Sequence, residues 1–188
     1  MPELPEVEIA RRLIASQALH RRLVEVDDSD SYVVRPHSPG ELRNALTGRS
    51  LIAALGPDAG HVTPAQFRAL ITRGTTAVKA RLLDQSKIAG IGNLLADEIL
   101  WQARVSPLAR TGSLSAAQVN RLYRALKSVL EAATAEGGAH TGGVIAARHP
   151  GGTCPRDGAP MVHGTVGGRS TWWCSREQAL PADQPNPV

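Results

Sequence analysis

Apolar residues recur every three or four positions along several stretches of the chain, which is the spacing of an amphipathic helix. The longest such stretch is 115–136, where Ser115 and Gln118 match a capping box and the apolar residues mark one face. The other expected helices span 5–19, 41–46, a segment that begins at Pro64 behind a Thr63 cap, and a segment that begins at an Asn93 cap and reaches Ala103. Most of the chain after residue 60 is therefore predicted to be helical.

Extended segments and turn signals divide the rest of the chain. Short strand candidates lie at 22–26, 31–34 and 49–55, and a Gly- and Pro-containing break follows at 56–60. Residues 137–152 are rich in glycine and poor in apolar residues, which predicts a linker. We expect an N-terminal segment over 1–60, a helical domain over 61–138, the linker and a small two-cysteine module over 139–178, and a disordered tail over 179–188.

The composition fits a globular protein, and its charge suits a polyanionic partner without requiring one. The chain has 188 residues, of which 42% are hydrophobic, so it can form one ordinary domain or two small ones. Its formal net charge is +4 and its pI is about 9.6. Arginine supplies nearly all the positive charge and suits bidentate phosphate contacts, although heavy arginine and alanine usage is equally explained by genome composition.

No targeting or membrane-spanning pattern is present in the sequence. The N-terminus lacks the apolar core of a signal peptide, and no apolar run is long enough to cross a bilayer. We therefore expect a cytoplasmic protein of the bacterial cytosol or nucleoid, with no membrane partner. The two cysteines would stay reduced in that compartment.

The chain begins Met1-Pro2-Glu3-Leu4-Pro5-Glu6-Val7-Glu8. If Met1 is removed, the Pro2 nitrogen becomes a secondary amine that can attack an aldehyde-like carbon and form an iminium. Glu3 would be close enough to move protons at that carbon. The alternative is that Met-Pro is a common start and that the acidic residues merely favour the first turn of a helix.

A second motif lies in the helical half, at 85–100. Gly90 and Gly92 allow the backbone to approach a ligand, and the helix that starts at Asn93 directs free N–H groups outward. On a basic protein the natural anion for such a site is a phosphate. A tight turn between packed helices is the alternative.

The N-terminal octet and the 85–100 motif both resemble the formamidopyrimidine-DNA glycosylase / endonuclease VIII family, in the order that the family shows. The resemblance implies an α+β fold. It has an N-terminal helix with a truncated β-sandwich remnant, a helix–two-turns–helix DNA-binding domain, and a small C-terminal β-hairpin finger.

The resemblance also assigns catalytic roles. Pro2 would attack the sugar carbon that carries the damaged base, and Glu3 would handle protons at the sugar. Glu6 and Glu98 would be supporting acids. An ordinary acid on the helix surface is the alternative for Glu98.

Three further residues are implied to bind DNA. Lys79 and Asn93 would hold phosphates beside the lesion. Arg169 follows two glycines, as at the tip of a β-hairpin, and would clamp the phosphates around the flipped nucleotide.

The two-cysteine module resembles the family's zinc finger, but two ligands are replaced. Cys154 is followed three residues later by Asp157, and Cys174 by Glu177, where the family has cysteines. Structural zinc sites prefer thiolate and imidazole ligands. We favour a finger without zinc, held by packing and by acid–arginine pairs, with the two cysteines as buried thiols; no cofactor is needed for catalysis.

Other residues of the module have two interpretations each. His149 and His163 could replace the missing zinc ligands, although their spacing gives no positive support. Trp172 and Trp173 could stack on bases, but we favour a role in the small core of the finger.

The resemblance fails in the middle of the chain, where most of the family's β-sandwich is missing. Two loops of the family are missing with the sandwich. One carries a lysine, and the other fills the gap left by a flipped base, whose extrusion costs a few kcal/mol. A truncated sheet would expose edges, which suggests a homodimer or another partner that covers it.

The sequence leaves more than one functional hypothesis. The first hypothesis is a DNA glycosylase with AP lyase activity, acting on damaged, abasic or single-stranded DNA. The alternatives are an inactive DNA-binding relative and, less favoured, a protein-interaction domain.

Overall fold

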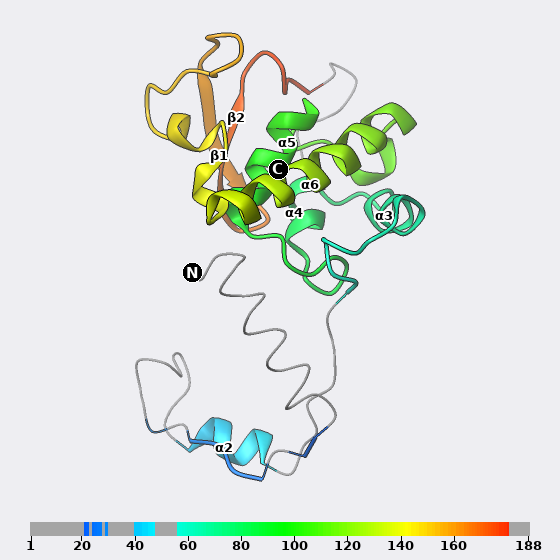
Figure 1. Cartoon of the computed structure of the whole chain (residues 1–188), viewed down its shortest axis with the longest axis vertical. Helices are drawn as coiled ribbons and strands as arrows, with labels where there is room; N and C mark the ends of the chain where they lie inside the picture. The colour runs from blue at the N-terminus through cyan, green and yellow to red at the C-terminus, as the bar shows by residue number, and fades with distance from the viewer. Residues whose placement is uncertain (1–20, 23, 28, 30–39, 48–55, 181–188) are drawn as a thin grey trace. The chain divides into compact units, whose positions relative to one another are not determined.

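The computed structural model describes residues 21–22, 24–27, 29, 40–47 and 56–180. These residues form a mixed fold of helices with one two-stranded antiparallel sheet (Figure 1). The α-helices are α2 (Glu41–Leu46), α3 (Pro64–Ile71), α4 (Val78–Leu83), α5 (Asn93–Ala103) and α6 (Ala116–Glu136). The 3₁₀ helices are η1 (Thr111–Ser113), η2 (Ala139–Thr141) and η3 (Ile145–Ala147), and the strands are β1 (Met161–Val166) and β2 (Arg169–Cys174).

The chain divides into two compact units, and the smaller one comprises Glu8–Ala54. Its helix α2 confirms the helix expected at 41–46, and Arg43 Nε donates to the carbonyl of Val26 at 3.0 Å. No strand is assigned to the described residues of the candidate at 22–26. The helix expected at 5–19 and the strands expected at 31–34 and 49–55 lie outside the described residues.

The larger unit begins with a helix whose start was predicted correctly. Thr63 and Gln66 form a reciprocal capping box at the N-terminus of α3, with Pro64 in the first turn. The same device, between Ser115 and Gln118, starts α6, and α6 ends at Gly137, which adopts a left-handed conformation with φ 87°. Both predicted helix starts are confirmed. They could be predicted because a capping box depends on two residues only three positions apart.

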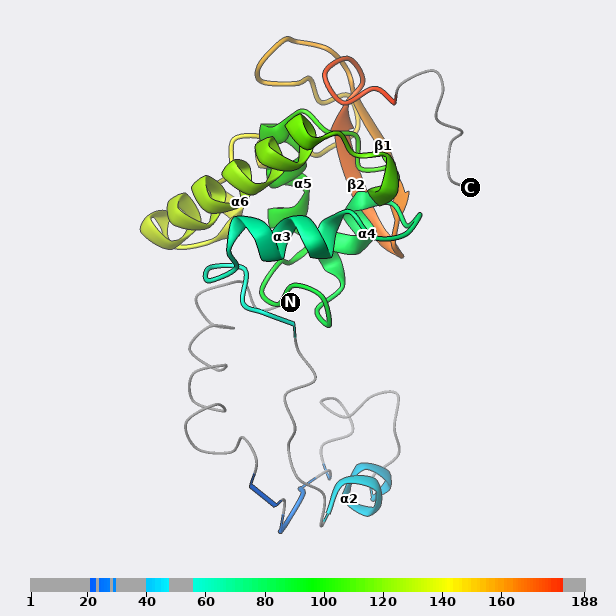
Figure 2. The same cartoon turned by 90° about the vertical axis from the view of Figure 1, so that its right-hand side faces the viewer.

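The main core lies between α3, α4, α5 and α6, as the two views of Figures 1 and 2 show. Helices α5 and α6 pack on each other, and both contribute essentially buried residues to this core, namely Leu95, Ile99 and Leu100 of α5 and Leu122 and Leu126 of α6. The core contains many aliphatic side chains and one phenylalanine, Phe67. Within the described part of the chain, no helix is long and apolar enough to cross a membrane.

The C-terminal hairpin pairs β1 with β2 through a two-residue turn. Val166 pairs with Arg169, and the turn residues Gly167 and Gly168 both have positive φ, 60° and 72°. Such a turn requires residues without a Cβ penalty, which confirms the predicted glycine tip. A Cβ on Gly167 would lie 3.0 Å from the Cβ of Ala80, so the tip packs closely on α4.

The finger has its own small core, and a helical residue completes it. Trp101 of α5 packs with Val144, Cys154 and Cys174, and half-buried Trp172 packs against them. The predicted core role of Trp172 is therefore confirmed, whereas Trp101 was not anticipated. The core of the finger therefore includes a side chain of α5, so the finger and the helices share part of one core.

The expected linker at 137–152 is more ordered than its composition predicts. It contains η2 and η3, and Val144 is fully buried in the finger core. Gly142 lies against the Glu98 carboxylate and Gly143 against the Trp101 ring, so that added Cβ atoms would come within 2.6 and 3.1 Å of them. Gly142 and Gly143 thus allow the backbone to pack closely on α5. The sequence pattern alone had predicted a linker here.

Candidate nucleic-acid interface

The loop before α5 is shaped by one side chain. Gln85 Oε1 accepts the N–H of Gly90 at 2.9 Å, and Gln85 Nε2 donates to the carbonyl of Ile91 at 3.0 Å. Gly90 has φ 94°, a conformation that favours glycine. Among the described residues, apart from its two chain neighbours, no atom lies within 4 Å of the position that a Cβ on Gly92 would occupy, so these residues leave open space in front of the helix.

The expected N-cap of α5 was wrong by one residue. Gly92 is the N-cap, and no side chain caps the helix. Asn93 is instead the first helical residue, and its Nδ2 donates to the carbonyl of Ser170 in β2 at 3.0 Å. Because the first turn has no capping side chain, its free N–H groups stay available to an anion.

Three residues of α5, four positions apart, face the finger. Asn93 contacts Ser170, Asp97 accepts the N–H of Trp172 at 3.3 Å, and Trp101 Nε1 donates to Cys154 Sγ at 3.3 Å. Residues at this spacing lie along one helix face. This stripe aligns the N-terminus of α5 with the hairpin.

The carbonyl of Ser170 joins two of the predicted DNA-binding residues. Lys79 Nζ donates to it at 3.1 Å, as Asn93 Nδ2 does at 3.0 Å. Arg169, the third, is the next residue along β2 and is exposed. No hydrogen bond or ion pair ties its guanidinium to another described residue. The structure therefore brings Lys79, Asn93 and Arg169 together, and it leaves Arg169 available for an external anion.

The position of Lys79 does not support the predicted phosphate contact. Its side chain is fully buried, and its Nζ lies 2.6 Å from Asp97 Oδ1. Burial lowers the pKa of Lys79, although Asp97 opposes that effect. A buried, paired ammonium cannot touch a phosphate in solution, so Lys79 holds other residues in place.

The burial of Glu98 contradicts the alternative given for it, an ordinary acid on the helix surface, because Glu98 is 3% exposed. Its Oε2 accepts the N–H of Val144 at 2.9 Å, and its Oε1 accepts Gln102 Nε2 at 2.9 Å. In the described part of the chain, Glu98 therefore anchors the segment between α6 and the finger. Pro2, Glu3 and Glu6 lie outside the described residues.

The finger retains three of the four donors that a zinc site would need. Donor atoms of Cys154, Asp157 and Cys174 lie within 4.8 Å of one another. Burial raises the pKa of the Cys174 thiol, and its S–H donates to Asp157 Oδ1 at 3.5 Å. The N–H of Ala159 holds the pKa of the Asp157 carboxyl below its usual value. The neutral Cys174 thiol and the charged Asp157 carboxylate thus form a hydrogen bond with each other that needs no metal ion.

Glu177, which stands at the fourth ligand position, faces away from these donors. Its Oε1 lies 3.2 Å from Arg104 Nε, and its Oε2 pairs with Arg156, whose guanidinium stacks 4.0 Å from the centre of the Trp101 ring. The acid–arginine pairs expected in the finger are confirmed. A closed structural zinc site takes four cysteine or histidine ligands, so the residues present do not fit one.

We predict that metal removal leaves the finger intact. Dialysis against EDTA should leave the thermal midpoint unchanged, whereas Glu177→Gln should lower it, because Arg156 and Arg104 lose their common partner. Calorimetry and elemental analysis of the same samples measure both effects. Loss of one zinc per chain with a large fall in the midpoint would contradict the prediction, since structural zinc contributes about 10–16 kcal/mol to small zinc-dependent folds.

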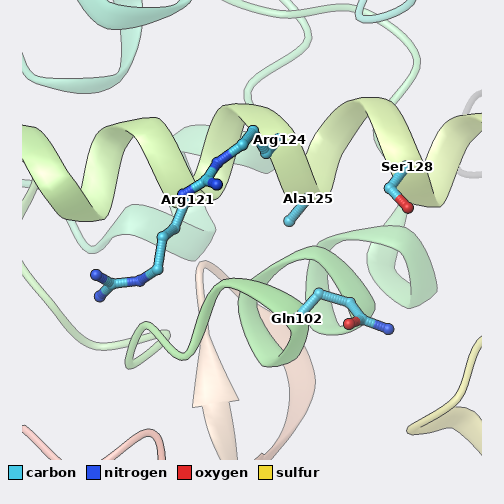
Figure 3. A pocket seen from close by; sticks show the side chains of 5 residues that line it. All are labelled: Gln102, Arg121, Arg124, Ala125 and Ser128. Carbon is cyan, nitrogen blue, oxygen red and sulfur yellow. The ribbon is translucent and has the colours of Figure 1, made fainter.

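A shallow pocket of about 280 Å³ lies between α5 and α6 (Figure 3). Its lining residues are Gln102, Arg121, Arg124, Ala125 and Ser128. Arg121 Nε donates to the carbonyl of Ala103 at 2.9 Å, and the guanidinium groups of Arg121 and Arg124 do not converge on one point. None of the predicted site residues lines this pocket, so we place the interface at the start of α5 and the hairpin tip.

Two family models match the chain. The formamidopyrimidine-DNA glycosylase N-terminal domain matches residues 1–55, and the formamidopyrimidine-DNA glycosylase H2TH domain matches residues 54–143. The chain belongs to the formamidopyrimidine-DNA glycosylase family. The two matches cover both motifs from which the family was predicted, the N-terminal octet and residues 85–100.

Several curated relatives are longer than this chain. The formamidopyrimidine-DNA glycosylase of Thermomicrobium roseum is 39% identical over 145 residues, which are 68% of this chain and 50% of that protein. The chain spans about half the length of the curated relatives it matches. The Thermus thermophilus protein is 29% identical over 262 residues, covering 93% of this chain and 97% of that protein. Because that alignment is longer than the chain, tens of its positions have no counterpart here. The two family matches meet at residues 54–55.

A solved structure of the family shares the fold. The complex between the Lactococcus lactis Fpg and DNA containing an abasic site aligns with a TM-score of 0.65 and 19% identity, over 95% of this chain and 100% of that chain. This likeness establishes the fold alone.

Sequence reasoning missed Asp97, Arg148, Gln85 and Trp101 as organisers of the site. One signal was present, because Asp97 and Trp101 lie four and eight residues after Asn93 and therefore share its helix face. Arg148 gave no signal, since its contact with Asp97 spans 51 residues of sequence.

Proposed function

We propose that this protein is a DNA-repair glycosylase with AP lyase activity that uses the Pro2 amine as its nucleophile. Family membership supports the glycosylase class. The single observation that carries DNA binding is the junction at Ser170, where the uncapped start of α5 meets the hairpin tip.

This junction offers two kinds of phosphate ligand side by side. The first turn of α5 presents N–H groups at the positive end of the helix dipole. Arg169 adds an exposed guanidinium, which can bind a phosphate through two parallel hydrogen bonds. A net charge of +4 favours the approach of DNA. The geometry therefore suits two neighbouring phosphates of one strand.

The proposed chemistry needs only the N-terminus. After removal of Met1, the nitrogen lone pair of Pro2 attacks C1′, the glycosidic bond breaks, and the base leaves with its electron pair and the proton that the Pro2 nitrogen loses. The C1′–O4′ bond of this sugar–Pro2 adduct then breaks, O4′ takes a proton, and an iminium forms between the Pro2 nitrogen and C1′. The iminium makes the C2′ proton acidic, and its removal expels the 3′ phosphate, which nicks the strand. Glu3 is the proposed proton carrier for these steps. On an abasic site the same iminium forms by loss of water from the sugar aldehyde.

Borohydride trapping tests the proposal. The chain is incubated with a duplex that carries one abasic site, and borohydride reduces any iminium to a stable amine. We expect a covalent protein–DNA adduct, seen as a band of reduced mobility in a denaturing gel and confirmed by mass spectrometry.

A parallel measurement separates chemistry from binding. Anisotropy of a labelled duplex at several salt concentrations reports DNA affinity independently of any reaction. Salt-dependent binding with no adduct, when mass spectrometry shows a free Pro2, would leave a DNA-binding protein without lyase activity. The absence of both would overturn the proposal completely.

A further inference from the structure

Asp97 occupies the centre of a buried charge cluster that the proposed chemistry does not use. Its side chain is 0% exposed, and its Oδ1 lies 2.6 Å from Lys79 Nζ. Its Oδ2 accepts Arg148 Nε at 2.9 Å and the N–H of Trp172 at 3.3 Å. One carboxylate therefore joins α4, α5, the segment after η3, and β2.

Hydrogen bonds lead from this cluster to the hairpin tip. Lys79 Nζ donates to Thr171 Oγ1 at 2.7 Å, and Thr171 Oγ1 donates to the carbonyl of Arg169 at 2.9 Å. Lys79 also donates to the carbonyl of Ser170, between these two residues. The carbonyls of Arg169 and of Ser170, which follows it, are thus tied to a buried ammonium, the first through the Thr171 hydroxyl.

The same cluster fixes the other half of the interface. Asn93 donates to the Ser170 carbonyl that Lys79 also contacts, and Asn93 lies one helical turn before Asp97. The relative position of the α5 N-terminus and Arg169 therefore depends on contacts that converge on Lys79. Without the Asp97 carboxylate, the buried Lys79 ammonium and the partly buried Arg148 guanidinium would lose the negative charge that they share.

We propose that Asp97 is a positioning residue for DNA binding: through Lys79 and Thr171 it holds Arg169 beside the start of α5, so that both engage adjacent phosphates. This inference rests on the proposed function, because it assumes that Arg169 binds a phosphate. It assigns Lys79 to the support of the interface rather than to the DNA itself.

The sign of the effect distinguishes positioning from simple electrostatics. Asp97→Asn removes a negative charge, and on charge alone this change tightens the binding of DNA. Positioning predicts the opposite, since a displaced Arg169 loses its phosphate contact. The salt dependence adds a second criterion, because each lost phosphate contact lowers the slope of log K against log salt by about 0.9.

The experiment measures affinity and salt slope for the full chain on a duplex with one tetrahydrofuran abasic analogue. Arg169→Ala should weaken binding about tenfold and lower the slope by about 0.9. Asp97→Asn should give a similar loss of slope and weaker binding. In the double variant, Asp97→Asn should add little to Arg169→Ala, because both remove the same contact.

Glu177→Gln is the matched control. It changes the net charge by the same amount and disrupts ion pairs of the finger, but it does not touch the Asp97 cluster. Its salt slope should equal that of the unmodified chain even where its thermal midpoint falls. If Asp97→Asn does not fold, Thr171→Val replaces it. That variant removes only the hydroxyl between Lys79 and Arg169, and it should lower the slope in the same way.

The outcomes separate the two proposals. If the unmodified chain shows no salt-dependent binding, the proposed function fails, and the positioning role fails with it. If the chain and Arg169→Ala behave as expected but the folded Asp97→Asn or Thr171→Val variant keeps the full slope, only the positioning role is overturned. Tighter binding by Asp97→Asn would likewise overturn it.

Discussion

Blocking the Pro2 nitrogen is expected to abolish the borohydride-trapped adduct. In a chain that carries an uncleaved Gly-Ser extension before Pro2, this nitrogen is part of a peptide bond and has no free lone pair for attack. The amount of adduct on abasic DNA should fall below detection, although DNA affinity should be retained. Pro2→Gly keeps a free primary amine after removal of Met1, so it should retain partial trapping.

Other amines of the extended chain supply the contrary outcome. An adduct of undiminished yield would show that another amine reacts instead, either the new N-terminal amine of the extension or a side-chain amine at Lys79, Lys87 or Lys127. Of these, Lys79 is buried against Asp97 and Lys127 is bonded to the carbonyl of Gly60. Peptide mapping of the trapped product would then identify the reacting residue.

Trp101→Ala is expected to lower the free energy of unfolding by about 3–5 kcal/mol, the usual cost of removing a buried large aromatic side chain. The ring is 6% exposed, its Nε1–H donates to Cys154 Sγ, and the Arg156 guanidinium covers one face. The change leaves a cavity in the finger core and removes the platform of Arg156. Urea denaturation followed by circular dichroism measures the loss.

Trp173→Ala is the control for this prediction. Trp173 is half-buried, packs on Gly164 in the hairpin, and does not belong to the finger core that contains Trp101. Its replacement should cost clearly less than that of Trp101. Equal losses for the two variants would contradict the assignment of Trp101 as the central residue of the finger core.

The features that were predicted from the sequence depend on near neighbours. Thr63 with Gln66 and Ser115 with Gln118 form their capping boxes within one turn, and the two-glycine hairpin tip is determined by its own backbone requirement. Such interactions involve residues a few positions apart, and no distant segment competes for them.

The features that were not predicted involve partners far along the chain. Asn93 did not cap its helix because its amide bonds to Ser170, 77 residues later. Lys79 was expected at the surface, but Asp97 and Thr171 provide it with buried acceptors. Glycines at 142–143 were interpreted as linker, because nothing local reveals the Glu98 and Trp101 side chains against which they pack.

The stripe of Asn93, Asp97 and Trp101 has a consequence for how the chain folds. Each of these residues bonds to a partner in the finger, and the bonds close loops of 53 to 77 residues. A finger without α5 therefore lacks the Trp101 ring that fills its core and the Asp97 carboxylate that pairs with Arg148. We expect α5 to form and pack on α6 before the hairpin docks, with the long loop closures slowing the last step. Hydrogen exchange should accordingly show the hairpin opening at a lower free energy than α5 and α6.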